Sequence, residues 1–153
     1  MLLFLKAVVA GLVAITSIGV AAESPVRFER VILTEQYFSD GIHCGDINRD
    51  GRTDIVSGPF WYEGPAFDLR HEFYPAVPHE PAKSPTDSLF SYLYDFNGDG
   101  WLDILVVGRV HLHPACWYEN PAGSQGLWKK HYAFERIQGE TPPWADLNQD
   151  GRP

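Results

Sequence analysis

The sequence predicts an all-β fold made of β-propeller blades of antiparallel strands, and three observations support this. An acidic turn of the form Asp-x-Asn-x-Asp-Gly occurs at residues 46–51, 95–100 and 146–151, a period of about fifty residues that is typical of propeller blades. Apolar and aromatic runs of strand length follow the first two turns. The chain has 14 Gly and 12 Pro, which favours many turns, and no stretch after residue 22 has convincing helical periodicity.

The same order of elements follows each complete turn. A continuous apolar run comes first and indicates a strand buried on both faces. A Trp-Tyr-Glu stretch, a Gly-Pro or Asn-Pro turn and a further strand come next. Residues 79–87 contain two prolines and are interpreted as a surface loop. The predicted strands are residues 55–56, 61–63 and 67–74 in the first repeat and residues 104–107, 117–119 and 127–134 in the second.

The repeats set the expected domain organisation. Residues 23–153 are interpreted as one propeller fragment, with repeats around 30–78 and 79–134 and an incomplete repeat at 135–153. A closed propeller needs at least four blades, and these repeats supply about two and a half. We therefore expect a truncated propeller. If the chain is complete, it should fold poorly or assemble with other copies, because a single blade exposes an apolar face.

Residues 1–22 are interpreted as a secretory signal peptide. Lys6 precedes an apolar run at 7–20, and the small residues Ala21 and Ala22 suit a cleavage site. The run is shorter than the roughly 20 residues that span a bilayer, although an uncleaved membrane anchor is the alternative. No other stretch is apolar enough to span a membrane. We expect the mature chain to be secreted, periplasmic or on the cell surface.

The acidic turns have the donor atoms of a calcium site. The net charge of −8 disfavours nucleic acid as a partner, and the acids gather in these turns. Alternating carboxylate and amide oxygens suit Ca²⁺ better than Mg²⁺, and the turns contain no nitrogen or sulfur ligand for zinc. Solvated Asp/Asn/Gly turns are the alternative. The predicted ligands are Asp46, Asn48, Asp50, Asp54 and the Arg52 carbonyl; Asp95, Asn97, Asp99, Asp103 and the Trp101 carbonyl; and Asp146, Asn148, Asp150 and the Arg152 carbonyl.

The turns differ from EF-hand loops. An EF-hand requires a glutamate at its twelfth position, where this chain has Ser57 and Val106. An EF-hand also leads into a helix, whereas these turns lead into apolar runs. The fourth side-chain ligand is expected at the ninth position, Asp54 and Asp103.

With an Asp-Ile-Val or Asp-Ile-Leu sequence and a glycine after the turn, the pattern resembles the FG-GAP/VCBS repeat of integrin α-subunit propellers and many bacterial exported proteins. The Trp-Tyr-Glu-Asn-Pro-Ala-Gly stretch at 117–123 is similar to a bacterial subgroup, and the resemblance covers most of residues 30–152. It implies a β-propeller with calcium held in loops between strands, but no single activity. We expect a non-catalytic module that binds an extracellular protein or polysaccharide. The alternative is the propeller part of a secreted enzyme similar to sugar lyases or dehydratases.

Histidines and cysteines raise two further possibilities. His111 and His113 would share one face of a strand and could form half of a transition-metal site that His131 would complete, or could be a coincidence of a surface strand. Cys44 and Cys116 could form a disulfide in an exported protein or could be separate thiols.

Two further residue types recur in both repeats. Trp61 and Trp117 are expected to pack between blades, with stacking on a sugar as the alternative. Glu63 and Glu119 occupy equivalent positions, which favours a role in the blade over catalysis. No Gly-x-Ser-x-Gly motif is present.

Overall fold

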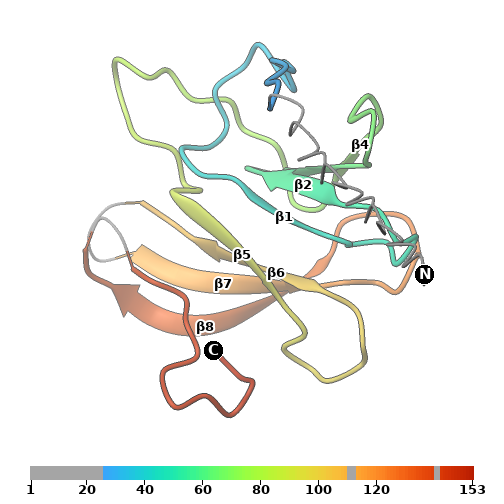
Figure 1. The fold of residues 1–153 in the computed structure, drawn as a ribbon. Coiled ribbons are helices and arrows are strands. Elements are labelled where there is room, and N and C mark those ends of the chain that lie inside the picture. The colour runs from blue at the N-terminus through green and yellow to red at the C-terminus, as the bar shows by residue number, and fades with distance from the viewer. Residues whose placement is uncertain (1–25, 110–112, 140–141) are drawn as a thin grey trace, which may run out of the picture. The chain divides into compact units, whose positions relative to one another are not determined.

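The strands form two four-stranded antiparallel sheets, one after the other along the chain, in the computed structural model (Figure 1). The structure describes residues 26–109, 113–139 and 142–153. The first sheet consists of β1 (His43–Gly45), β2 (Asp54–Ser57), β3 (Phe60–Tyr62) and β4 (Arg70–Glu72). The second consists of β5 (Phe90–Tyr94), β6 (Asp103–Val107), β7 (His113–Glu119) and β8 (Lys129–Ile137).

The two sheets repeat one unit. In each sheet, consecutive strands pair with one another, and the acidic loop joins the first strand to the second. Gly45 pairs with Asp54 across the first loop, and Tyr94 pairs with Asp103 across the second, so the register is the same. Over the described residues the fold is therefore propeller-like, with two blade-like sheets that do not close into a barrel.

The strand after each acidic loop is buried on both faces, as its apolar run predicts. All five side chains of β6 are buried. Ile104 and Val106 face the core between the sheets, whereas Leu105 and Val107 belong to a cluster on the opposite face. Burial of one such side chain contributes roughly 1.5–3 kcal/mol, so this core is a main contact between the repeats. It consists of Ile47, Val56, Trp61, Phe73, Ile104, Val106, Cys116, Tyr118 and Trp128.

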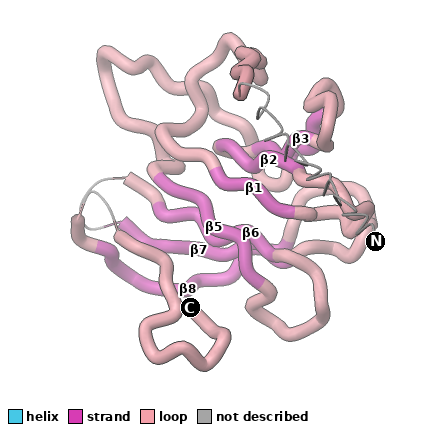
Figure 2. The backbone as a smooth tube through the Cα atoms, in the orientation of Figure 1, coloured by secondary structure: helices cyan, strands magenta, loops and turns pink. Residues whose placement is uncertain are grey.

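The all-β class is confirmed, because the described residues contain strands and loops and no helix (Figure 2). The strands after the acidic loops and the Trp-Tyr-Glu strands lie where they are predicted. The last strand of the first sheet is shorter than the predicted 67–74. Phe67 has a φ of 59° and its amide donates to the Glu63 carbonyl at 2.8 Å, which forms a turn before the strand.

Two strands were not predicted. β1 and β5 precede the acidic loops, and their sequences, His-Cys-Gly and Phe-Ser-Tyr-Leu-Tyr, give no continuous apolar run. They form because β2 and β6 offer their free edges to them. Residues 79–87 contain no strand, as expected of a loop, and only His79 forms an isolated bridge, with Tyr37.

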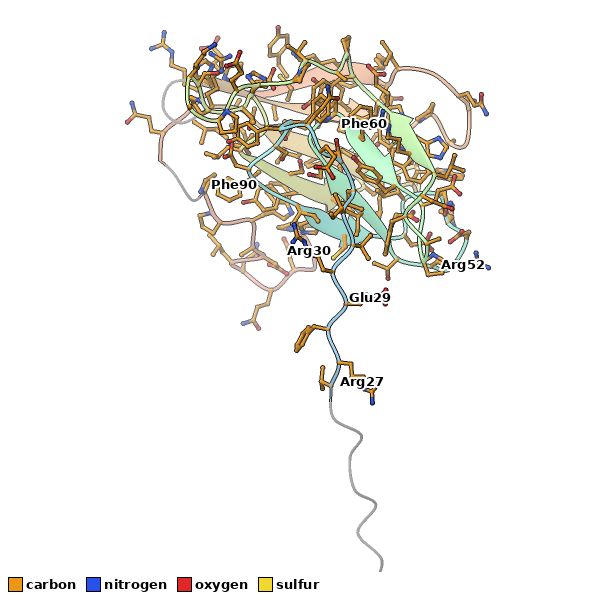
Figure 3. The ribbon with its side chains drawn as sticks, turned by 90° about the horizontal axis from the view of Figure 1, so that it is seen from above. Arg27, Glu29, Arg30, Arg52, Phe60 and Phe90 are labelled. Carbon is orange, nitrogen blue, oxygen red and sulfur yellow. The ribbon has the colours of Figure 1, made fainter. Side chains whose placement is uncertain are left out.

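The N-terminal segment is where the sequence predicts an export signal. The predicted signal peptide lies outside the described residues, and residues 26–30 are exposed and extended (Figure 3). Met1–Arg30 and Val31–Pro153 are separate units. In the described part of the chain, no helix is long and apolar enough to cross a membrane.

The two cysteines do not pair. Cys44 is exposed and Cys116 is buried, and both are free thiols, so the disulfide is not formed.

Glycines allow the two sheets to approach closely where β1 lies beside β5 (Figure 1). A Cβ at Gly41 would lie 2.5 Å from the Leu89 carbonyl oxygen, and one at Gly45 would lie 2.8 Å from Leu93 Cδ1. Next to Gly41, the Asp40 amide donates to the Ser88 carbonyl at 3.1 Å. The backbones of the two repeats are thus in direct contact at this point.

We predict that Gly41→Ala destabilises the protein by about 1–3 kcal/mol, the usual effect of overpacking, because the clash is with backbone that cannot rotate away. Urea unfolding followed by tryptophan fluorescence measures the change. Gly108→Ala is the matched control, since its Cβ would meet only atoms at 3.4 Å or more. Equal stability of the two variants would contradict the close approach.

Candidate calcium loops

Each acidic loop wraps its backbone around the carboxylate of its first aspartate. In the first loop, Asp46 Oδ1 accepts the amide of Asp50 and Oδ2 accepts the amide of Gly51, both at 3.0 Å. This requires left-handed backbone at Arg49 (φ 62°) and Gly51 (φ 83°). Glycine adopts such a conformation without steric cost, which explains the glycine at the sixth position of the motif.

The other two loops repeat this geometry. Asp95 accepts the amides of Gly98, Asp99 and Gly100 at 2.7–3.1 Å. Asp146 accepts the amides of Gln149, Asp150 and Gly151 at 2.6–3.2 Å. The sixth-position glycines, Gly100 and Gly151, have φ of 89° and 86°. The partial third motif therefore has the same local structure as the two complete ones.

The third and fifth positions are also ordered by backbone amides. In the first loop, Asn48 Oδ1 accepts the Asp50 amide at 3.0 Å, and Asp50 Oδ1 accepts the Arg52 amide at 2.9 Å. The side chain of Arg52 points away from the strands (Figure 3), so this residue can offer a cation only its carbonyl oxygen. The first aspartate is half-buried in all three loops, and the fifth-position aspartate is exposed.

The ninth-position aspartates are placed differently from the other predicted ligands. Asp54 is fully buried, and its carboxylate accepts the amides of Ile47 at 2.8 Å and Gly64 at 2.9 Å. Asp103 in the same way accepts the amides of Phe96 at 2.9 Å and Asn120 at 2.8 Å. These carboxylates join the acidic loop to the turn that follows the Trp-Tyr-Glu strand. Ligation by Asp54 and Asp103 stays a prediction.

Charge is concentrated in the second loop. Burial raises the pKa of the Asp103 carboxyl above its ordinary value, the amides of Asn120 and Phe96 oppose the rise, and the charges of Asp99 and Asp95 add to it. The carboxylates of one loop thus repel one another unless a cation lies nearby.

The donor atoms of the loops are oxygens only. Each loop offers two aspartates, one asparagine and a main-chain carbonyl, with a buried aspartate behind them in the two complete loops. This set fits a hard cation such as Ca²⁺. Within the described ranges, no three His, Cys, Asp or Glu side chains gather as a metal-binding group. The three carboxylates predicted in each complete loop thus do not converge on one point, and the ninth-position carboxylate is turned toward backbone amides.

A second constellation, Trp–His–Glu, recurs in both sheets. The rings of Trp61 and His71 stack with centroids 4.1 Å apart, and His71 Nε2 lies 2.7 Å from Glu63 Oε1. Trp117 and His131 stack at 4.0 Å, and His131 Nε2 lies 2.7 Å from a Glu119 oxygen. Both copies have the same contacts, and the interpretation of the repeated glutamates as part of the blade stays a prediction.

The stacked histidines were not identified from the sequence. The segment between tryptophan and histidine is longer in the second repeat, which hides the equivalence of His71 and His131. The cross-strand register, Trp61 with His71 and Trp117 with His131, reveals it.

Of the two interpretations of His111 and His113, the transition-metal site receives no support from a third imidazole among the described residues. His113 is exposed at the start of β7, and His111 lies outside the described residues. His131 is paired with Trp117, four residues along β7 from His113, and its Nε2 is bonded to Glu119.

Comparison with known protein families identifies the repeat. Residues 95–153 match the family described as FG-GAP-like repeat. The chain carries an FG-GAP-like repeat. The expected resemblance is confirmed for residues 95–153, from the first residue of the second acidic loop through β6, β7 and β8 to the third loop. The match does not include the first repeat. No curated protein and no solved structure matched the chain.

We predict that Asp54→Ala and Asp103→Ala destabilise the protein even in excess chelator. Asp54→Ala leaves three backbone amides without this acceptor and Asp103→Ala leaves two, and an unsatisfied buried polar group costs about 1–3 kcal/mol. Chemical unfolding in EDTA measures the loss. Asp99→Ala is the control, because Asp99 is exposed and its removal should leave the stability in EDTA nearly unchanged. Equal losses for Asp103→Ala and Asp99→Ala would contradict the structural role.

We also predict a pH-dependent contribution from Glu119. The hydrogen bond from His131, followed by that from Lys129, lowers the pKa of the Glu119 carboxyl below its ordinary 4.5. A carboxyl with a depressed pKa stabilises the fold above its ordinary pKa and loses that stabilisation as pH falls through its folded pKa. Below pH 4.5, wild type should therefore lose more stability than Glu119→Gln.

Thermal unfolding between pH 3 and pH 6 checks the Glu119 prediction. His131→Ala should flatten the profile as Glu119→Gln does, because it removes the main donor. Identical slopes for wild type and both variants would show that the pair contributes nothing.

Proposed function

We propose that this protein is an exported, calcium-binding propeller module that binds an extracellular protein or polysaccharide without catalysing a reaction. Its place of action would be the periplasm, the cell surface or the medium. The observation that carries the proposal is the threefold recurrence of one loop geometry with an oxygen-only donor set at Asp46, Asp95 and Asp146.

The residues that would hold calcium are the first, third and fifth side chains of each loop, the carbonyl of the seventh residue and, in the two complete loops, the ninth-position aspartate. Ca²⁺ would supply positive charge that offsets the repulsion between the carboxylates. The backbone amides already orient the first aspartate, so part of the ordering cost of binding is met by the fold. A carboxylate oxygen has two lone pairs, so Asp54 and Asp103 retain acceptor capacity beside their amide bonds.

Calcium would act on the fold through the ninth-position aspartate. Asp103 joins the second loop to Asn120, and the Asn120 side chain donates to the carbonyls of Ile47 and Leu102, both at 3.0 Å. Ile47 lies in the first loop and Leu102 in the second. Calcium that orders either loop would therefore also stabilise the contact between the two sheets, and metal binding would be coupled to folding.

The non-catalytic form of the proposal is supported by the repeated use of the acid–base pairs. Glu63–His71 and Glu119–His131 have equal geometry in both sheets, whereas a catalytic pair is expected once. Among the described residues, His79 and Asp87 form an acid–base pair that is not repeated, with His79 Nε2 3.3 Å from Asp87 Oδ1. The lyase or dehydratase function therefore stays the alternative.

We predict that excess EDTA lowers the melting temperature and that Ca²⁺, but not Mg²⁺, restores it. A ligand at 100 times its Kd stabilises the folded state by about 2.7 kcal/mol per site, which corresponds to roughly 10 °C for a domain of this size. Differential scanning fluorimetry measures the shift, and isothermal titration calorimetry counts the sites.

Asp50→Asn and Asp99→Asn should each reduce the calcium-dependent shift, because each removes one charged donor. Asp68→Asn is matched in charge and exposed outside the loops, so it should leave the shift intact. A melting temperature that changes with neither EDTA nor Ca²⁺ would refute the calcium proposal.

A further inference from the structure

A groove of about 480 Å³ lies where the two repeats meet, a volume within the range of roughly 300–1,000 Å³ that is usual for small-molecule sites. The first repeat lines it with β4 and the first acidic loop, and the second repeat lines it with Trp101 and the 120–128 segment. The Asn120–Ile47 hydrogen bond brings the 120–128 segment to the first loop, beside which it passes in Figure 1. The groove belongs to neither repeat alone.

Three indole rings line the groove. Trp61 and Trp128 are 8% and 9% exposed and lie in the core between the sheets, so packing fixes them. Trp101 is half-buried, and the Arg49 guanidinium lies 5.4 Å from its ring centroid. Trp101 is thus the ring that a ligand can reach. The negative face of an indole attracts the weakly positive C–H groups of a pyranose face.

Polar groups surround these rings. Glu63 uses Oε1 for His71, and Glu72 uses Oε1 for the Ala76 amide, so each has a second oxygen that can accept a hydrogen bond. Ser124 and Gln125 are exposed, and within the described residues their side chains have no hydrogen-bond partner. These groups offer acceptors and donors to the hydroxyl groups of a ligand.

The charge of the side chains that line the groove favours a neutral sugar over an acidic one. Glu63 and Glu72 place two carboxylates in the groove, and the guanidinium of Arg70 lies 4.5 Å above the Phe60 ring. The whole chain carries −8. An acidic sugar would be repelled here, whereas a neutral ligand rich in hydroxyl donors would find acceptors.

We propose that this groove binds a segment of neutral oligosaccharide, with Trp101 as the stacking platform and Glu63, Glu72 and Gln125 as hydrogen-bonding groups. The proposal rests on the binding function proposed above and names its ligand class and site. Trp101 and Asn48 belong to acidic loops, so calcium would support two walls of the groove, while Trp61 and Trp128 are held by the core.

The test is isothermal titration calorimetry of the full-length protein in excess Ca²⁺. The probes are neutral hexasaccharides of glucose, mannose, xylose and galactose, with hexagalacturonate as the acidic comparator. At least one neutral probe should bind more tightly than hexagalacturonate. Trp101→Ala should weaken that binding about tenfold, equivalent to about 1.4 kcal/mol, and Gln125→Ala should weaken it severalfold. Trp101→Ala leaves the predicted ligand at this position intact, because that ligand is the main-chain carbonyl.

Tyr132→Ala is the control, because Tyr132 is an aromatic residue that is 76% exposed on β8 and outside the groove. It should bind as wild type does. The groove proposal is overturned if no neutral probe binds, if hexagalacturonate binds best, or if Trp101→Ala and Gln125→Ala both bind normally. Circular dichroism confirms that each variant is folded.

The melting temperature separates this proposal from the calcium proposal. A calcium-dependent melting temperature without saccharide binding would overturn the groove and leave the calcium sites standing. Saccharide binding that requires Trp101, with a melting temperature indifferent to EDTA, would overturn the calcium sites and leave the groove standing.

Discussion

A fully buried carboxylate after each complete acidic loop is the constraint on which the rest of the structure depends. Both carboxylates accept amides from the loop and from the turn after the Trp-Tyr-Glu strand: Asp54 accepts two loop amides and one turn amide, and Asp103 accepts one of each. An ionised group is buried only when such partners compensate its lost hydration. These bonds fix where the second strand starts, and hence which of its side chains face each side of the sheet.

The alternation along β2 and β6 builds the contact between the repeats. Val56, Ile104 and Val106 lie in the core between the sheets, while Ile55, Leu105 and Val107 belong to clusters on the outer faces. A slip by one residue would exchange the two sets. The buried carboxylate therefore positions the acidic loop and also the surface by which one sheet packs on the next.

The sequence was sufficient for the repeats, because the acidic turns and apolar runs are local signals. Contacts between residues far apart in the sequence could not be predicted from such local signals. β1 and β5 have no apolar pattern of their own and exist through pairing with β2 and β6. The same holds for the role of Asp54, whose partner Gly64 is ten residues away, and for His71 and His131, which only the cross-strand register makes equivalent. The third loop was predictable throughout, since its hydrogen bonds join residues within the motif.

Repetition also indicates where a specific function can arise. The loops and the Trp–His–Glu sets recur with equal geometry, so whatever they do serves every repeat alike. The groove combines members of these recurring sets, among them Glu63 and Trp101, with elements that are not equivalent: β4 of the first repeat and the 120–128 segment of the second. Substitutions at Arg70, Glu72 or Gln125 change it without touching the repeated contacts. The junction between repeats can therefore acquire a ligand preference while the buried carboxylates preserve the fold.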